Sequence, residues 1–413
     1  MKHLVFTVSL FASLIYFSVS SLLGLSVTED GGSTAFYKVY CAIVFVLFAF
    51  CYSKIYLKKR LTTRHIISYW ILLFYIINAL ITGYATDTSM LVLVAFGLPA
   101  AGTAIYYAEH HNLQKMVKWI DVLLPIISIS LVFSLKQLLI EIAEGKGYYS
   151  QTLSYYAAYC FVLYLFFLLF GQEYERFSFF KGDRYKFFSI LMLPYLLGIM
   201  FFSGGRGALG TIAIGTGLLF YLYHKRYGIN KIAVIRSFIA AVALSAIVFM
   251  FLPEETKDVF YSNFNRVFSY FDPTKDMYER TSGRDDVLKV AFSQIYQNPI
   301  LGSGLFSYKD SFLLKSEVPY PHNLFIEVLL QGGITFFTIF IILLLNIFIK
   351  LYHISRLPNE ELVIIFMAFS MTMLMYSGSY MQNSFFYFFV FYVFNYSFRK
   401  INEKDIVYFN NVS

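Results

Sequence analysis

Long apolar segments recur along almost the whole 413-residue chain, and this feature limits most strongly how the chain can fold. Hydrophobic residues make up 58% of the sequence and charged residues only 14%, against about 25% charged residues in ordinary soluble domains. Helices of about 20 apolar residues span a bilayer core and satisfy their own backbone hydrogen bonds there. The chain is therefore predicted to be an all-α integral membrane protein. This composition excludes a soluble enzyme, a disordered protein and a nucleic-acid binder.

Twelve membrane-spanning helices are expected from the spacing of the apolar segments. They lie near residues 4–26, 35–56, 65–84, 88–107, 119–140, 152–171, 187–203, 208–224, 236–252, 329–350, 361–380 and 383–398. The first segment follows Lys2 and resembles a signal peptide, but it is longer than a signal-peptide core and lacks an A-x-A-like cleavage site. We therefore expect it to be a retained membrane helix.

The distribution of Lys and Arg predicts the orientation of the chain. If the N-terminus is cytoplasmic, the cytoplasmic segments contain 21 of the 33 basic residues, and the short outer loops contain four. Cytoplasmic loops carry such an excess of basic residues. Both termini are therefore predicted to be cytoplasmic. The net charge of +8 then reflects orientation and needs no nucleic-acid partner.

One long outer loop divides the chain into three parts. Residues 1–252 contain predicted membrane helices one to nine, residues 253–321 form the loop domain, and residues 322–413 contain helices ten to twelve and a cytoplasmic tail. The loop contains ten acidic and eight basic residues, so it is close to neutral. Its sequence is not of low complexity, which favours a small folded domain.

Two short helices and a turn are predicted within this loop. The first helix, near residues 256–270, places on one face Phe260, Phe264, Val267 and Phe268. The second follows a capping box formed by Ser282 and Asp285. Its apolar stripe consists of Val287, Leu288, Ala291, Phe292 and Ile295. The glycines at 302 and 304 then predict a flexible turn.

His322 is the histidine whose position suggests chemistry. The other six histidines fall at predicted cytoplasmic helix ends, whereas His322 lies on the outer side, directly before the tenth span. It follows Pro321, which favours the first helical turn, so His322 is expected at a helix N-terminus. An imidazole with its ordinary pKa near 6.5 can accept a proton at neutral pH. The alternative is that His322 only anchors the helix at the membrane interface.

Arg206 is the only charged residue between Phe187 and Tyr223. An arginine near the bilayer core costs roughly 2.5–3.5 kcal/mol on insertion scales and therefore usually marks a functional site. The glycines around it, in Ser203-Gly204-Gly205-Arg206-Gly207, would let backbone N–H groups approach an anion closely. The alternative is that Arg206 extends from a tight turn to the membrane surface.

Three further arginines, Arg266, Arg280 and Arg284, lie in the long loop. Arg284 is expected in the first turn of the second loop helix, where its guanidinium adds to the positive end of the helix dipole. Arginine also binds phosphate through two parallel hydrogen bonds and stays charged. The alternative is that these arginines form only weak surface ion pairs with nearby carboxylates.

The residues on the outer side predict a diphosphate site without a metal or another cofactor. No set of His, Cys, Asp and Glu there has metal-ligand spacing, and Asp121, near the cytoplasmic end of the fifth span, is expected to lie in water. Several arginines suit a lipid-linked diphosphate, and a neutral imidazole suits the hydroxyl of an incoming sugar. Together they predict glycosyl transfer from a polyprenyl diphosphate sugar.

Three motifs in order resemble the O-antigen ligase and polymerase superfamily. They are Ser203-Gly204-Gly205-Arg206-Gly207-Ala208-Leu209, Arg284 with Gln297-Asn298-Pro299-Ile300-Leu301-Gly302-x-Gly304, and Pro321-His322-Asn323-Leu324-Phe325-Ile326-Glu327 with Gly332-Gly333-Ile334. The resemblance covers roughly residues 187–340. It implies a bacterial inner (plasma) membrane protein with a GT-C-like fold of about twelve helices and a large periplasmic loop. It also implies transfer of glycans from undecaprenyl diphosphate with inversion.

The resemblance also implies roles for single residues. Arg206 and Arg284 would bind the donor diphosphate, and His322 would be the base or would orient the acceptor. Further substrate-binding residues would be Arg266, Arg280, Asn323 and Glu327.

Three functions stay open at this point. A Wzy-type polymerase of O-antigen, capsule or exopolysaccharide is favoured by the composition, rich in Phe, Tyr and Ile, and by the compact loop. A WaaL-type ligase would instead transfer the polymer to lipid A–core. A flippase or transporter would need polar groups in the middle of the membrane and usually two related halves. Expected partners are lipid-linked glycans, membrane lipids, and possible chain-length regulator and flippase proteins.

Overall fold

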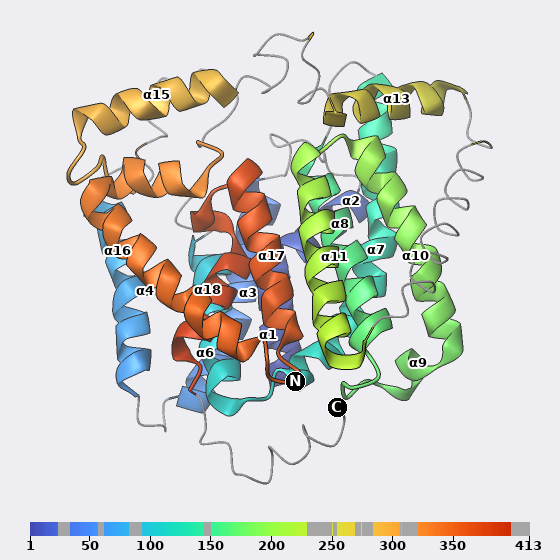
Figure 1. Ribbon diagram of the computed structural model, residues 1–413, viewed down its shortest axis with the longest axis horizontal. Helices are drawn as coiled ribbons and strands as arrows, with labels where there is room; N and C mark the ends of the chain where they lie inside the picture. Colours follow the sequence, from blue (N-terminus) through green and yellow to red (C-terminus); the bar gives the residue numbers. More distant parts are fainter. Residues whose placement is uncertain are drawn as a thin grey trace.

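The computed structural model describes residues 1–23, 34–56, 62–81, 93–143, 150–228, 250, 254–268, 274, 284–305, 307 and 321–397. All regular elements among these residues are helical (Figure 1). In chain order they are α1 Lys2–Leu10, α2 Ala12–Leu22, α3 Thr34–Tyr56, α4 Thr63–Ile81, η1 Leu93–Gly97, α6 Leu98–His110, α7 Gln114–Ala143, α8 Gln151–Phe170, α9 Ser178–Lys181, α10 Asp183–Ser203, α11 Arg206–Tyr227, α13 Glu254–Phe268, α15 Arg284–Gln297, α16 Leu324–Ile354, α17 Glu361–Tyr376, η5 Tyr380–Gln382 and α18 Ser384–Asn395.

The helices confirm an all-α membrane protein but do not confirm the count of twelve spans. Among the described residues, six helices are long and apolar enough to cross a membrane: α3, α7, α8, α10, α11 and α16. The pair α1 and α2 would make a seventh if taken as one broken span, and α17 and α18 are shorter apolar helices. The predicted ninth span, 236–252, lies outside the described residues except for Met250.

The first span is broken, so the prediction of one continuous helix over residues 4–26 is wrong. Helices α1 and α2 meet at Phe11 with a bend of 78°. Two hydroxyl groups satisfy carbonyl oxygens beside the break: Ser384 donates to the Leu10 oxygen at 2.9 Å and Tyr40 to the Ala12 oxygen at 2.7 Å. These bonds allow a helix to break inside an apolar bundle, where free carbonyl groups are costly.

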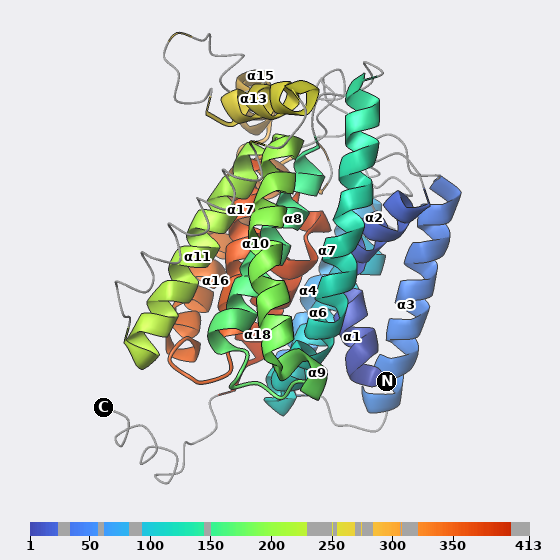
Figure 2. The same cartoon turned by 90° about the vertical axis from the view of Figure 1, so that its right-hand side faces the viewer.

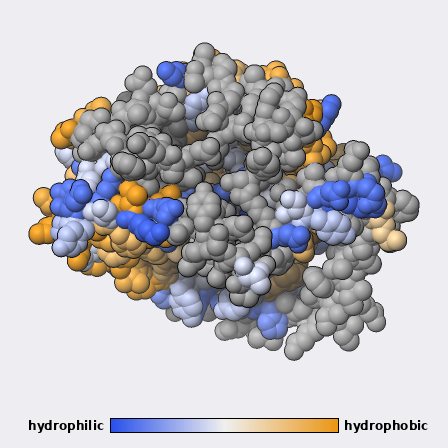
Figure 3. Space-filling view, turned by 90° about the horizontal axis from the view of Figure 1, so that it is seen from above, coloured by the Kyte–Doolittle hydropathy of each residue, from blue (hydrophilic) through white to orange (hydrophobic). Residues whose placement is uncertain are grey.

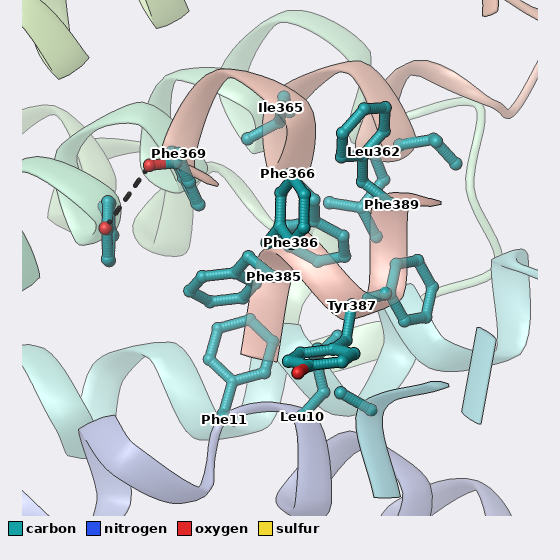
Figure 4. Packing of buried hydrophobic residues seen from close by; sticks show 14 of the residues in the cluster. Leu10, Phe11, Leu362, Ile365, Phe366, Phe369, Phe385, Phe386, Tyr387 and Phe389 are labelled. Carbon is teal, nitrogen blue, oxygen red and sulfur yellow. Dashed lines mark hydrogen bonds between the residues drawn. The ribbon is translucent and has the colours of Figure 1, made fainter. Parts of the chain in front are cut away.

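An aromatic core joins this break to the last two helices. Phe11 packs edge-on against Phe385 at 5.4 Å between ring centroids, and Phe385 stacks on Phe366 at 5.0 Å (Figure 4). Such ring pairs add roughly 0.5–1.5 kcal/mol each beyond the area that they bury. The break between α1 and α2 is therefore held in one cluster with α17 and α18.

Helices α13 and α15 lie across one end of the bundle, which we call the loop end (Figures 1 and 2). The N-terminus lies at the opposite end. Helix α13 packs on the end of α10, with ring centroids of Phe260 and Phe264 5.8 and 5.6 Å from that of Phe201. The predicted inward face of this helix is therefore confirmed at Phe260 and Phe264.

Helix α15 buries a slightly different stripe from the one predicted. Val287 and Ala291 are buried as predicted, but Phe292 is 53% exposed, and Val290 packs inward in its place. Tyr296 on the same helix is 88% exposed. Seen from the loop end, hydrophilic and hydrophobic side chains lie next to each other on the surface (Figure 3).

Candidate active site

The turn that carries Arg206 is short and buried. Helix α10 ends at Ser203, Gly204 adopts the left-handed conformation with φ of 71°, and α11 begins at Arg206. The Ser154 hydroxyl oxygen of α8 accepts a hydrogen bond from the Gly205 N–H at 2.8 Å and lies 2.7 Å from the Ser203 hydroxyl oxygen. The turn is thereby fixed on the first helical turns of α8.

The glycines of this turn serve packing, which differs from the prediction that they expose backbone to an anion. The N–H of Gly205 is already bonded to Ser154. A Cβ atom at Gly205 would overlap the Ser154 side chain, and one at Gly207 would overlap the Tyr155 hydroxyl. Close approach of α11 to α8 therefore requires glycine at both positions.

Arg206 is the first residue of α11 and is half-buried. Its guanidinium therefore belongs to a helix N-terminus, where the dipole and the first backbone N–H groups favour an anion. Next to it, a Cβ atom at Gly207 would lie 3.0 Å from the Cβ of Tyr376. Arg206 thus lies beside the last residue of α17.

The turn from α17 to α18 connects this region to α16. The Ser377 hydroxyl donates to the side-chain oxygen of Gln151, the first residue of α8, at 2.8 Å. Two residues later, the Ser379 hydroxyl donates to the carboxylate of Glu327 in α16. The ends of α8, α11, α16 and α17 therefore meet at the loop end.

His322 directly precedes the capped start of α16, as predicted. Helix α16 begins at Leu324, and its N-cap residue is Asn323, whose side-chain oxygen accepts from the N–H groups of Phe325 and Ile326 at 3.0 and 3.2 Å. His322 has a φ of 54° and is 8% exposed. A left-handed conformation is uncommon for a residue other than glycine and is often found at functional sites.

The environment of His322 keeps its imidazole neutral. Burial, and to a smaller extent the positive charge of Arg284, together lower the pKa of His322 to about 3. Arg284 is the half-buried first residue of α15, and its positive charge acts on the imidazole. A neutral imidazole can accept a hydrogen bond from a hydroxyl.

Glu327 lies one turn into α16 and faces the interior of the protein. It is 1% exposed, and its carboxylate accepts hydrogen bonds from the Ser379 hydroxyl, from the Tyr380 N–H at 3.3 Å and from the Gln331 amide at 3.3 Å. Gln331 in turn accepts from the Tyr380 hydroxyl at 2.6 Å. Glu327 was predicted to bind substrate, but in the structure its carboxylate is surrounded by protein groups.

The second and third sequence motifs form one backbone-paired unit. Helix α16 is kinked at Gly333, which has a φ of 58°, and the turn formed by residues 298–304 pairs with this kink. Four backbone hydrogen bonds of 2.8–3.2 Å join them: Ser303 to Leu330, Gly304 to Gln331, Ile334 to Pro299 and Thr335 to Ile300. The turn predicted to be flexible is therefore paired along its length.

Two predicted substrate residues have no described side chain. Arg266 lies on α13, but its side chain is outside the described residues, and Arg280 is wholly outside them. Asn323 is described, and its side-chain oxygen is engaged in capping α16. Among the described residues, no group of three or more His, Cys, Asp and Glu side chains could hold a metal ion.

Asp121 is buried, so the expectation that it lies in water is wrong. Its side chain is 0% exposed and accepts two hydrogen bonds from the Arg176 guanidinium, at 2.7 and 2.9 Å. The guanidinium of Arg176 also lies over the ring of Phe167, 4.8 Å from its centroid. Arg176 and Asp121 therefore form a buried ion pair at the end of the bundle opposite the candidate site.

Sequence reasoning missed the residues of the α17–α18 turn, Ser377, Ser379 and Tyr380. Their only sequence signal is a short polar run, Ser377-Gly378-Ser379-Tyr380, between two strongly apolar segments. That run predicts a turn, but nothing in it identifies Glu327 as its partner.

One family model matches this chain at residues 187–341, and its description is O-antigen ligase. This segment, less than half of the chain, therefore matches a domain of the O-antigen ligase and polymerase superfamily. The O-antigen ligase match extends from α10 into the kinked part of α16 and includes Arg206, Arg284 and His322. It confirms the resemblance that the three motifs indicated. No curated protein matches the chain.

Proposed function

We propose that the protein is a Wzy-type polymerase that extends O-antigen or a capsular or extracellular polysaccharide at the periplasmic face of the bacterial inner membrane. In this proposal both termini are cytoplasmic, and the donor is an oligosaccharide repeat unit linked to undecaprenyl diphosphate. One observation carries the proposal: His322 is buried at the start of α16, where burial and the charge of Arg284 keep its imidazole neutral, inside the segment that matches the O-antigen ligase family.

The proposed reaction is a direct displacement at the anomeric carbon of the donor sugar. The acceptor hydroxyl oxygen forms a bond to this carbon, the bond from carbon to the diphosphate oxygen breaks, and undecaprenyl diphosphate leaves with the bonding electrons. Attack opposite the leaving group inverts the anomeric configuration. Arg206 and Arg284 stabilise the negative charge on the leaving diphosphate, so the proposed reaction requires no metal ion.

His322 accepts the proton of the attacking hydroxyl in this proposal. The imidazole is a weak base in the free protein because Arg284 and burial both lower its pKa. A diphosphate bound at Arg284 would offset the cation and raise the pKa of His322, so the base would strengthen when the donor is present. Such a group contributes about 10²–10⁴-fold to the rate.

Arg266, Arg280 and Asn323 complete the proposed substrate site, with Asn323 acting at the start of α16. The proposed partners are membrane lipids and the chain-length regulator and flippase that would supply and limit the polymer.

The ligase reaction is the second candidate because the matching family model is described as O-antigen ligase. It uses the same donor chemistry with lipid A–core as acceptor. A transporter is a candidate of another class, and the broken α1–α2 pair is the observation that favours it, since transporters bind substrates at such breaks. Against it, the described polar and charged groups of the site gather at one end of the bundle.

The test is the polysaccharide pattern of a deletion strain that carries chosen variants. His322→Ala and Arg206→Lys should each reduce polymer formation by at least about 10²-fold, because the first removes the base and the second removes bidentate phosphate binding. His224→Ala, at the opposite end of α11, is the matched control and should keep the wild-type pattern.

The same strain distinguishes the candidates. Loss of chain extension with a single repeat still attached indicates a polymerase, and loss of all attachment with accumulation of lipid-linked polymer indicates a ligase. Wild-type polymer in an inserted His322→Ala variant would contradict both enzyme proposals and favour transport.

A further inference from the structure

The first part of α16 is a short helix whose two ends are both fixed. Asn323 caps its start through two hydrogen bonds to backbone N–H groups. Its other end is the kink at Gly333, held by four backbone hydrogen bonds from the turn of residues 298–304. Figure 1 shows this part of α16 beneath α15 before the helix bends down into the bundle. His322 therefore lies at the start of a rigid segment, Leu324–Gly332.

The side of this segment is tied to the α17–α18 turn. Glu327 and Gln331 lie one turn apart and are each at most 2% exposed. They receive hydrogen bonds from the Ser379 hydroxyl and from both the N–H and the hydroxyl of Tyr380. The Gln331 amide closes the network by donating to Glu327 at 3.3 Å.

Every group in this network has a complementary partner. The Glu327 carboxylate accepts three hydrogen bonds, and the Gln331 side chain both accepts one and donates one. Removing a single donor leaves a buried oxygen atom without its hydrogen bond, which costs the desolvation penalty of that oxygen. The arrangement consequently fixes the rotation of Leu324–Gly332 about its own axis.

We propose that Ser379, Tyr380 and Gln331 are positioning residues that act through Glu327 to hold His322 in place at the start of α16. Glu327 in this assignment contacts no substrate, because its carboxylate is buried against the α17–α18 turn. The inference rests on the proposed role of His322. Displacement of a catalytic group by about 1 Å can cost about 10²-fold in rate, so a network at this distance from the chemistry can control turnover.

The test compares Ser379→Ala with the conservative variant Ser379→Thr, which keeps the hydroxyl. Both are assayed as full-length protein in lipid nanodiscs with an undecaprenyl-diphosphate-linked repeat unit. Ser379→Ala should lower kcat about 10- to 100-fold with KM for the donor nearly unchanged, and Ser379→Thr should restore most of the loss. Amide hydrogen exchange in residues 324–332 should rise in Ser379→Ala and not in Ser379→Thr.

A matched control removes a similar bond elsewhere. The Ser134 hydroxyl bonds to the Ser21 hydroxyl at 2.5 Å and joins α7 to α2. Ser134→Ala should leave kcat and exchange in residues 324–332 at wild-type values. If Ser379→Ala behaves like this control while His322→Ala abolishes turnover, the positioning role is wrong and the proposed function stands. If His322→Ala itself keeps full turnover, the proposed function fails, and faster exchange in Ser379→Ala then shows only that the network orders α16.

Discussion

At the scale of single residues, the proposed chemistry depends on the pKa of one imidazole. His322 is buried and is subject to the positive charge of Arg284, and both effects disfavour the imidazolium. Between pH 6.5 and about 3 the unfolded chain binds a proton at this position that the native protein does not bind. The part of the free energy of unfolding that depends on His322 is therefore fully present above pH 6.5 and is lost as the pH falls toward 3.

The pH profile of activity should show this displaced titration. The acid limb of the kcat/KM profile reports the pKa of His322 in the free protein, which is about 3, so kcat/KM should show no acid limb near pH 6.5. The limb of kcat should lie at a higher pH than that of kcat/KM, because the bound diphosphate offsets Arg284. The measurement is initial rate against pH from 4 to 9 in nanodiscs. A limb near pH 6.5 in kcat/KM would mean that His322 is not shielded as described.

At the scale of elements, the kink in α16 is the feature on which the site depends most. Gly333 has a φ of 58°, and a Cβ atom there would overlap the carbonyl of Ile300. Gly333→Ala should therefore lower the free energy of unfolding by roughly 2–4 kcal/mol and remove activity. Thermal unfolding in detergent measures the effect. Gly217→Ala is the control, because a Cβ at Gly217 has no heavy atom within 4 Å; equal melting of both variants would refute the paired kink.

The buried ion pair between α7 and the segment after α8 makes a second prediction at this scale. Asp121→Ala leaves the Arg176 guanidinium, whose side chain is 4% exposed, without its carboxylate. Breaking such a pair on one side costs roughly 3–5 kcal/mol. Glu175→Gln breaks the more exposed pair with Lys118 and should cost less than about 1 kcal/mol. Thermal unfolding in detergent measures both variants, and similar melting temperatures would contradict the account.

Sequence reasoning predicted several helices, including α10 and α11, and missed the partners that hold the elements together. Hydropathy placed α10 and α11 on either side of the Ser203–Arg206 turn, because lipid imposes length and composition on a span. The break at Phe11 has no proline or glycine to signal it and is supported by Tyr40 and Ser384 from distant segments. Partners that lie far apart in sequence leave no periodic pattern.

In the candidate site, too, the sequence indicated the local structure but not the partners that lie far away in the chain. His322 was predicted at the start of a helix, and the capping preference of Asn323 explains why it is found there. The bonds from Ser379 and Tyr380 to Glu327 cross 52 and 53 residues of sequence and could not be predicted. Asp121 was misplaced for the same reason, since Arg176 lies 55 residues away.

At the scale of the whole molecule, the proposal requires the loop end to face the periplasm. Tyr296 on α15 is 88% exposed at the loop end, and the Asp183 side chain, at the start of α10, is 95% exposed at the opposite end. A membrane-impermeant maleimide applied to cells with a permeabilised outer membrane should label Tyr296→Cys and not Asp183→Cys. The native cysteines Cys41, Cys51 and Cys160 are buried and should give little background. The reverse labelling pattern would place the site in the cytoplasm and contradict the proposed donor.

The central claim is that His322 and Arg284 act together on a lipid-linked diphosphate donor. Its most direct test is single-turnover glycosyl transfer by the purified protein in nanodiscs, with the donor bound in advance. We expect the wild-type protein to extend the glycan and release undecaprenyl diphosphate, and His322→Ala to bind the donor normally but react at least about 10²-fold more slowly. Transfer by His322→Ala at the wild-type rate would contradict the account.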